Sequence, residues 1–215
     1  MDRLVKYFRT HHLPWSESIT DDDLVMISPF TCDSDVVVTI KMDGESFSGH
    51  PSGHCHARSL DSGYHESRNY VKALWHSKAH LLPPLWRVCG ENLYAKHSIH
   101  YDDLESYLYV FSIWTEENIC LSWDETLLWC DLLELTPVQV IYRGKYDEQA
   151  IKQSFIPFKE QHEGYVIRSS ESFHYDDSSK NVAKYVRKNH VQTSSHWMFQ
   201  EVVPNKLINS EDKIV

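Results

Sequence analysis

The chain has 215 residues and a formal net charge of −10, and 41% of its residues are hydrophobic. This length and apolar content suit one large domain, or one domain with a small appendage. A protein whose only task is to coat nucleic acid would be basic, so the acidic balance excludes that class and allows only local contacts with nucleic acid. The five cysteines contain no CxxC pair, which favours free thiols in a reducing compartment. Because no apolar stretch is long enough for a membrane span and no signal peptide follows Met1, we expect a cytoplasmic protein without membrane contact.

The first half of the chain predicts two helices around a group of strands. Leu4, Val5 and Phe8 indicate a short helix that ends before Pro14. We expect strands at residues 24–27 and 36–42, a hairpin tip at 47–54, a returning arm at 54–59 and a helix at 66–82. The strand at 36–42 is the clearest of these elements, because a run of β-branched residues forms it.

In the second half, strands are expected at residues 85–89, 107–114, 138–142, 165–167 and 184–186, and the last of these also permits a helix. Gly90 is expected to begin a new element, and residues 143–144 a turn.

A capping box of Ser122 and Glu125 predicts a helix through Leu133, and a shorter helix is expected at 147–155. The sequence shows no internal repeat, low-complexity tract or clear linker. It therefore predicts a single α+β domain at residues 1–203, followed by a loose tail at 204–215.

The strand at 36–42 runs directly into Lys41, which Asp43, Gly44 and Glu45 follow. Gly44 is expected to form the turn that ends the strand. A lysine held near a pocket with apolar walls can lose its proton near neutral pH and act as a nucleophile. The alternative is a surface lysine beside an ordinary turn, since so short a pattern also matches by chance.

Three further charged stretches lie next to expected strands. Glu91 follows Gly90, Glu163 precedes the strand at 165–167, and Lys184 stands near Arg187. Taken alone, Glu163 is equally typical of a solvated corner, while Glu91 and Lys184 are more typical of a surface turn and a solvated face.

Taken in order, these stretches form a series of motifs. The series is K-x-D-G-E at Lys41, H-A-R at Arg58, G-E at Glu91, F-S-I-W at Phe111, E-G-Y-V-I-R at Glu163 and K-Y-V-R at Lys184. It resembles the covalent nucleotidyltransferase superfamily of ATP-dependent ligases and mRNA capping enzymes. Within that superfamily, the sequence is most similar to the small phage and bacterial RNA ligases of RNA repair. The resemblance runs from about residue 35 to residue 197.

The resemblance implies a nucleotidyltransferase (adenylation) domain of antiparallel sheets flanked by helices, and we expect no C-terminal OB-fold. It implies an ATP-dependent RNA ligase that seals 5′-phosphate and 3′-hydroxyl RNA ends through lysyl-AMP and RNA-adenylate intermediates. The expected cofactors are ATP and Mg²⁺, with Mn²⁺ as a second candidate metal. The attacking amine must be neutral, so we expect a site that favours the uncharged form of the lysine.

The resemblance also implies a role for each motif. Lys41 is expected to be the nucleophile, Asp43 to orient its amine or a metal-bound water, and Glu163 to bind the metal through water. For the nucleotide, the expected contacts are Arg58 to a phosphate, Glu91 to the ribose, Phe111 to the adenine face and Lys184 to the α-phosphate.

The sequence departs from the family pattern at two positions. Ile40 stands where many family members carry a polar residue that reads the adenine, which leaves ATP or GTP open. The last motif is commonly K-x-K, but position 186 is Val, so Arg187 is predicted to be the second cation because it is the nearer one.

The sequence also permits several different readings of the chain. His50, His54, Cys55, His56 and His65 form a cluster that a zinc ion or a plain polar hairpin would explain. The chain could also be a non-sealing nucleotide- or RNA-end-binding module, a capping-type guanylyltransferase or a DNA ligase. We expect a monomer that binds RNA ends and ATP, and we hypothesise an end-healing kinase or phosphatase as a partner.

Overall fold

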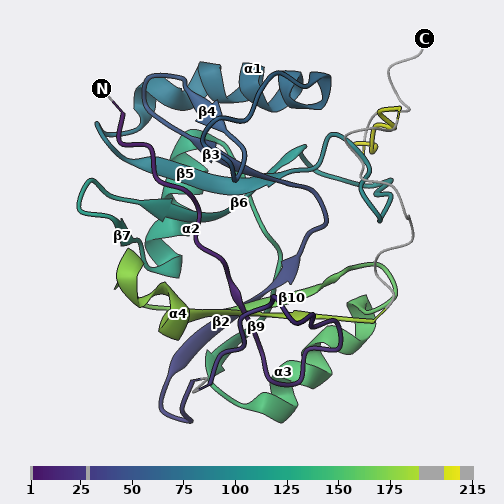
Figure 1. Cartoon of the computed structure of the whole chain (residues 1–215). Coiled ribbons are helices and arrows are strands. Elements are labelled where there is room, and N and C mark those ends of the chain that lie inside the picture. Colours follow the sequence, from purple (N-terminus) through teal and green to yellow (C-terminus); the bar gives the residue numbers. More distant parts are fainter. Residues whose placement is uncertain (1, 28–29, 189–200, 209–215) are drawn as a thin grey trace.

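The computed structural model describes residues 2–27, 30–188 and 201–208. Within these residues the strands form a five-stranded sheet in the order β1-β12-β10-β2-β9 and a seven-stranded sheet in the order β11-β7-β6-β5-β3-β4, with β8 beside β6. The two sheets lie one above the other, with α1 above the larger sheet and α3 below the smaller one (Figure 1). The predicted α+β architecture of mainly antiparallel sheets with flanking helices is confirmed.

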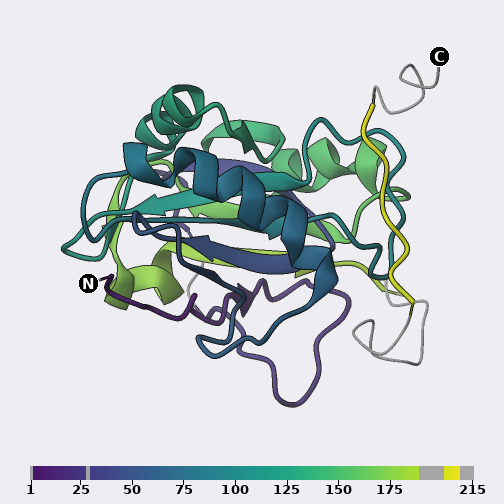
Figure 2. The ribbon, with the colours of Figure 1, turned by 90° about the horizontal axis from the view of Figure 1, so that it is seen from above.

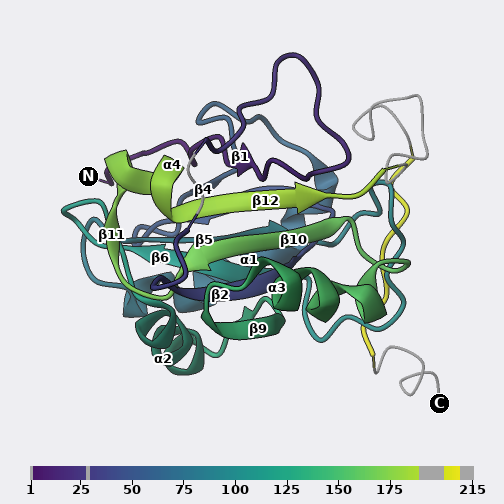
Figure 3. The same ribbon diagram turned by 90° about the horizontal axis from the view of Figure 1, so that it is seen from below.

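The smaller sheet is built around the β-branched run of the sequence. Its strands are β1 (His11–His12), β2 (Asp35–Lys41), β9 (Val140–Lys145), β10 (Gly164–Ser169) and β12 (Val182–Val186). Figure 3 shows β12, β10 and β2 side by side, with α3 (Glu148–Phe155) across them. Side chains of a strand alternate between its faces. Val36, Val38 and Ile40 therefore share one face, and they belong to the same buried core as Ile151 and Phe155 of α3.

The larger sheet contains the remaining strands, which are β3 (Glu45–Gly49), β4 (Cys55–His56), β5 (Arg87–Asn92), β6 (Leu108–Trp114), β7 (Ile119–Cys120), β8 (Thr136–Pro137) and β11 (Phe173–His174). Helix α1 (Asn69–Lys78) lies across this sheet, as the view from above shows (Figure 2). It is extended by 3-10 turns at Glu66–Arg68 and Ala79–Leu81, so the predicted helix at 66–82 is confirmed.

Helix α2 (Trp123–Leu133) begins at Ser122, whose side chain forms the predicted reciprocal capping box with Glu125. Two short elements complete the part of the chain next to β12. They are a 3-10 turn at Tyr175–Asp177 and helix α4 (Ser178–Asn181). A further 3-10 turn at Ile156–Phe158 extends α3.

The predicted N-terminal helix is wrong. Residues 2–10, here called the N-terminal segment, form neither helix nor strand, and the chain then continues into β1, which pairs in parallel with β12. Tyr7 and Phe8 pack into an aromatic cluster with Trp114, and this tertiary contact overrides a weak helical spacing. The strand expected at 24–27 is reduced to a single bridge between His12 and Val25.

Two glycines expected to interrupt the chain lie inside strands. Gly90 is in the middle of β5, at a register shift next to Cys89, and Gly144 is in β9. A Cβ atom on Gly90 would lie 2.5 Å from the backbone oxygen of Tyr109. The glycine is therefore needed for a close approach of two strands, and not for a turn.

Part of the expected loose tail is packed against the body of the protein. Asn205 is 1% exposed, and its backbone and side chain bond to the backbone of Tyr94, Leu93 and Tyr101. The expectation is therefore wrong for residues 204–208, while residues 209–215 lie outside the described residues. The boundary at residue 203 stays a prediction.

The five cysteines are all free thiols, as expected. Among the described residues, no helix has the length and apolar character that a membrane span needs.

Candidate active site

A cavity of about 730 Å³ lies between the two sheets and is lined by side chains from both. Six of the residues singled out from the sequence line it: Ile40, Lys41, Arg58, Glu91, Phe111 and Lys184. Motifs spread over most of the chain therefore converge on one hollow. The other three, Asp43, Glu163 and Arg187, lie outside its lining.

Lys41 and Glu163 form an ion pair at the edge of this cavity. Lys41 ends β2 and is paired across the sheet with Gly164, so Glu163, immediately before β10, lies beside it. Nζ of Lys41 is 2.5 Å from Oε2 of Glu163. Burial by itself lowers the pKa of Lys41, but the carboxylates of Glu163, Glu91 and Asp43 outweigh this effect and the pKa is raised. The protein alone therefore holds Lys41 as an ammonium, and the expectation of a site that favours the neutral amine is wrong at this stage of the reaction.

Glu91 enters the cavity from β5 and is held close to Lys41 by the turn after β2. Its Oε1 accepts a hydrogen bond of 3.2 Å from the backbone N–H of Gly44. A Cβ atom on Gly44 would lie 2.5 Å from the backbone oxygen of Asn92, so only glycine allows this turn to pack against β5. Burial raises the pKa of Glu91 to about 8, against the opposing effect of Lys41. The carboxyl group is therefore mostly protonated at neutral pH.

Lys184 and Arg58 are two of the further cations that share the cavity with Lys41. Lys184 lies on β12 opposite Val166 of β10, which in turn pairs with Thr39 of β2, so Lys184 is offset by two residues from Lys41 on the same face. Burial lowers the pKa of Lys184, and the neighbouring Lys41 lowers it further. Arg58 follows β4 and lines the cavity from the larger sheet. Several cations in one partly apolar cavity are suited to a polyphosphate anion.

The carboxylate of Asp43 is partly used within the protein. Its Oδ2 accepts hydrogen bonds of 2.7 and 2.8 Å from the backbone N–H groups of Ser98 and Ile99, and its own N–H donates to the hydroxyl of Tyr101. These bonds fix the loop at 98–101 against the turn after Lys41. Oδ2 is therefore engaged within the protein, and the role predicted for Asp43 next to the amine stays a prediction.

Phe111 and Ile40 meet the cavity in different ways. Phe111 of β6 is half-buried and presents its ring to the hollow. The Ile40 side chain, 2% exposed, belongs to the core with α3, on the other face of β2 from Lys41. Only the backbone of Ile40 faces the cavity, so the side chain at this position does not contact a base bound there.

Arg187 is not brought into the cavity. Its side-chain Nε donates a hydrogen bond of 2.8 Å to the backbone oxygen of His162, and its backbone N–H donates to the backbone oxygen of Glu163. Along β12 the residue on the same face as Lys184 is Val186, which is buried. The side chain of Arg187 thus supports the corner before β10, and the prediction that it supplies the second cation is not supported by its position.

Sequence reasoning missed the contribution of the N-terminal segment. Lys6, Tyr7 and Arg9 line the cavity. The sequence of this segment has no strand pattern, and its weak helical spacing predicted the wrong structure. No local signal therefore indicated that these residues line the cavity. The pairing of β1 with β12, which brings them to the site, is a contact between the two ends of the domain.

Arg168 was also left without a role, although its motif was recognised. It is 4% exposed and donates to the backbone oxygens of Ser169, Phe111 and Leu121. Because β10 belongs to the smaller sheet and Phe111 to the larger one, this guanidinium ties the two sheets together at the inner wall of the cavity.

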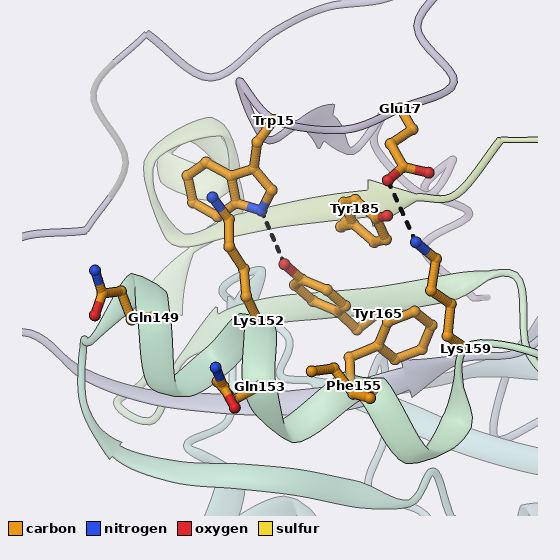
Figure 4. A pocket seen from close by; sticks show the side chains of 10 residues that line it. Trp15, Glu17, Gln149, Lys152, Gln153, Phe155, Lys159, Tyr165 and Tyr185 are labelled. Carbon is orange, nitrogen blue, oxygen red and sulfur yellow. Dashed lines mark hydrogen bonds and ion pairs between the residues drawn. The ribbon is translucent and has the colours of Figure 1, made fainter.

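A second hollow, of about 610 Å³, lies beside α3 and the loop after β1. Figure 4 shows that Trp15, Tyr165, Phe155 and two lysines line it, with the indole of Trp15 bonded to the hydroxyl of Tyr165. None of the site residues predicted from the motifs lines this hollow. Tyr165 and Ile167 alternate with Val166 along β10, so this hollow lies on the opposite face of the sheet from the cavity.

The histidines considered for a zinc site gather at the β3–β4 hairpin. The ring centroids of His50, His54 and His56 are 5.2 to 6.0 Å apart. In the part of the chain that the structure describes, however, no group of three or more His, Cys, Asp or Glu side chains is arranged to hold a metal ion. The zinc hypothesis therefore finds no support.

Comparison with known proteins agrees with this architecture. The family model described as RNA ligase matches residues 34–186. No curated protein sequence matches the chain. Among solved structures, a putative ATP-dependent DNA ligase from Aquifex aeolicus has a TM-score of 0.51 at 19% identity, over 74% of this chain and 44% of that one.

Two RNA ligases show a similar level of likeness. An archaeal ATP-dependent RNA ligase has a TM-score of 0.51 at 18% identity, over 74% of this chain and 43% of that one. An apo mutant of the Naegleria gruberi RNA ligase has a TM-score of 0.50 at 13% identity, over 87% of this chain and 61% of that one. The chain thus spans less than two thirds of the length of these structures, and at these identities the likeness concerns the fold.

Proposed function

Since the chain belongs to the RNA ligase family, we propose that it catalyses the ATP-dependent joining of RNA ends. The ends joined are a 5′-phosphate and a 3′-hydroxyl, and the intermediates are AMP bound to Lys41 and then AMP bound to the RNA 5′-phosphate. The observation that carries the proposal is the position of Lys41, whose amine lies at a nucleotide-sized cavity between Glu163, Glu91 and Lys184.

In the first step, the amine of Lys41 attacks the α-phosphorus of ATP. A phosphorus–nitrogen bond forms, and the bond to the bridging oxygen breaks as pyrophosphate leaves. The ammonium must lose a proton before this attack, and Oε2 of Glu163, 2.5 Å from Nζ, is positioned to accept it. Lys184 and Arg58, which line the cavity, would contact the phosphate oxygens.

The carboxylates at the cavity fit the requirements of a divalent metal ion. Mg²⁺ keeps most of its waters in proteins and needs only one or two carboxylates, so the lack of a larger acidic cluster among the described residues is no obstacle. Glu163 and Oδ1 of Asp43 would hold the hydrated ion. When bound, the ion would neutralise charge on the phosphates.

In the remaining steps, AMP moves from Lys41 to the RNA 5′-phosphate, and the 3′-hydroxyl then attacks that phosphate and releases AMP. Glu91, mostly protonated at neutral pH, and Phe111 would hold the ribose and the base throughout. Arg58 would contact the phosphate of AMP or of the RNA end. We further propose that the protein is a monomer with one adenylation domain, served by an end-healing kinase or phosphatase.

The decisive experiment is labelling with α-³²P ATP in the presence of Mg²⁺ or Mn²⁺. We expect label that survives denaturation of the wild-type protein, no label on Lys41→Ala, and wild-type labelling of Lys180→Ala, a control at a lysine that is 77% exposed. No label on the wild type with any nucleotide would favour the non-sealing binder instead.

The choice of nucleotide and of nucleic-acid substrate distinguishes an RNA ligase from a capping enzyme and from a DNA ligase. Labelling by GTP in place of ATP would favour a guanylyltransferase of the capping type. Sealing of nicked DNA in preference to RNA would favour a DNA ligase. Efficient sealing of RNA ends by the chain alone at physiological salt would argue against the need for a partner.

A further inference from the structure

The N-terminal segment crosses from the larger to the smaller sheet along the cavity. Figure 1 shows this stretch (purple) running in front of the strands from the upper sheet to the lower one. The hydroxyl of Tyr175 donates to the backbone oxygen of Lys6 at 2.7 Å, and β1 anchors the other end to β12. Residues between these two anchors, including Tyr7, line the cavity.

The register of the smaller sheet indicates where the base of a bound ATP would lie. This step rests on the proposed function. On the face of the smaller sheet that lines the cavity, the next residues from Lys41 toward the start of β2 are Thr39 and Val37. Thr39 pairs with Val166, and Val37 pairs with Arg168. Strand residues rise by about 3.3 Å, so Arg168 is about 13 Å along the sheet from Lys41. With the α-phosphate at Lys41, the base would lie about halfway between Lys41 and Arg168. The edge of the base farthest from the ribose would then face the end of the cavity at which Tyr7 lies.

Tyr7 forms a wall of that end of the cavity and does not block it. Its ring centroid is 5.1 Å from that of Phe111, with an angle of 67° between the planes. A base stacked between two rings needs centroids about 7 Å apart, so no base fits between Tyr7 and Phe111. The cavity nevertheless keeps about 730 Å³ with Tyr7 in place, which is within the range of small-molecule sites.

The hydroxyl of Tyr7 is held in a small polar network at this apolar end. It lies close to the side chain of Ser112, which also lines the cavity, and burial raises the pKa of Tyr7, so the phenol stays neutral. Ser112 Oγ already accepts a hydrogen bond of 2.9 Å from the indole of Trp114. When the hydrogen of Ser112 is donated to Tyr7, the hydrogen of Tyr7 is left for an acceptor in the cavity.

The residue before the nucleophile, Ile40, does not supply a polar side chain that could recognise the base. The side chain of Ile40 is apolar and lies on the other face of β2. The guanidinium of Arg168, which also lines this end, already donates to three backbone oxygens. Tyr7 and Ser112 both line the cavity, so this pair is available to the edge of a bound purine.

We propose that Tyr7 is the base-recognition residue of this site and that its hydroxyl donates to a ring nitrogen of adenine. Adenine N1 accepts a hydrogen bond, whereas guanine N1 carries a hydrogen and is a donor. The N-terminal segment thus supplies the discrimination between ATP and GTP that the residue before the nucleophile does not supply here.

Equilibrium binding of ATP and GTP tests the proposal without depending on the chemistry. Titration calorimetry would compare the wild type with Tyr7→Phe, which keeps the ring and loses the hydroxyl. We expect the Kd for ATP to rise about fivefold, as one lost hydrogen bond typically brings, with little change for GTP. Tyr64→Phe removes the hydroxyl of a tyrosine that is 78% exposed and serves as the matched control.

Where adenylation is observed, Tyr7→Phe should raise the KM for ATP and leave kcat within about twofold, because the hydroxyl contacts the base and not the reacting phosphate. Tyr7→Ala should weaken ATP binding further, provided that a thermal melt shows a folded protein. Unchanged ATP and GTP affinities in Tyr7→Phe would overturn the proposal, and so would tighter binding by Tyr7→Ala, which would make the ring an obstacle.

The outcomes also separate this inference from the function on which it rests. If the wild type binds ATP but never forms an adduct, the ligase proposal fails while the comparison of affinities still decides the role of Tyr7. If the wild type binds neither nucleotide, both proposals fall.

Discussion

His50 provides a prediction about acid stability whose size follows from its surroundings. The side chain is 0% exposed at the end of β3, and neither ring nitrogen has a hydrogen-bond partner among the described residues. Burial and the neighbouring His56, His54 and Arg87 lower its pKa to about 4, while Asp2 opposes them. The folded state therefore keeps His50 neutral at a pH where the unfolded chain is protonated.

The sign and size of the effect follow from proton linkage. With a pKa of 6.5 in the unfolded chain and about 4 in the folded protein, stability is fully present above pH 6.5 and is lost as the pH falls toward 4. Between pH 8 and pH 5 the loss is about 2 kcal/mol from His50. His12, whose pKa burial likewise lowers to about 4, contributes a similar amount. For a chain of this size, each contribution lowers Tm by about 4–8 °C.

Urea unfolding of the wild type and of His50→Phe at pH 8 and pH 5 measures this effect. The variant keeps a flat ring and loses the proton site, so its change in unfolding free energy from pH 8 to pH 5 should be about 2 kcal/mol less unfavourable than that of the wild type, because all other titrating groups are common to both proteins. His80→Gln, at an exposed histidine, should behave as the wild type does. The reasoning is refuted if the free energy of unfolding changes by the same amount between pH 8 and pH 5 in the wild type and in His50→Phe.

Two further predictions concern the site and its frame. Gly164→Ala should cost on the order of 3 kcal/mol or more in unfolding free energy, because a Cβ atom there would lie 1.9 Å from the backbone oxygen of Tyr185, between β10 and β12; a thermal melt within about 2 °C of the wild type would contradict this. Glu91→Gln should keep ATP affinity at pH 7 within about threefold, since the carboxyl is already mostly protonated there, whereas Glu91→Leu should weaken it about tenfold; equal affinities of the two variants by calorimetry would show that Glu91 does not contact the nucleotide.

The elements that sequence alone predicted are those with a strong local cause. β2 and β6 carry long apolar or β-branched runs, and α2 has a capping box whose two hydrogen bonds both form. The same holds for the site: Lys41, Glu91 and Lys184 each lie in or directly next to a recognisable strand, so their convergence followed once the motifs were taken in order.

The elements that sequence alone missed depend on contacts between distant parts of the chain. The N-terminal segment has a weak helical spacing, but its course is set by Tyr7 and Phe8 packing near Trp114 and by β12, which is far away in sequence. Arg187 was chosen because it is close to Lys184 in sequence, whereas the alternation of strand faces turns it away from the cavity. Neither error could be corrected without the register of the strands.

The charge of the cavity explains how so acidic a chain can bind a polyphosphate. The net charge of −10 is a sum over the whole protein, whereas a ligand in a partly buried site responds mainly to nearby groups. In the cavity, burial raises the pKa of Glu91 so that its negative charge is largely lost at neutral pH, while Lys184 and Lys41 lie close enough for each to affect the other. Glu163 offsets the charge of Lys41 directly. The local balance is therefore positive although the protein as a whole is acidic, while the nearby carboxylate of Glu163 holds the nucleophile protonated until a ligand changes the contacts of Glu163.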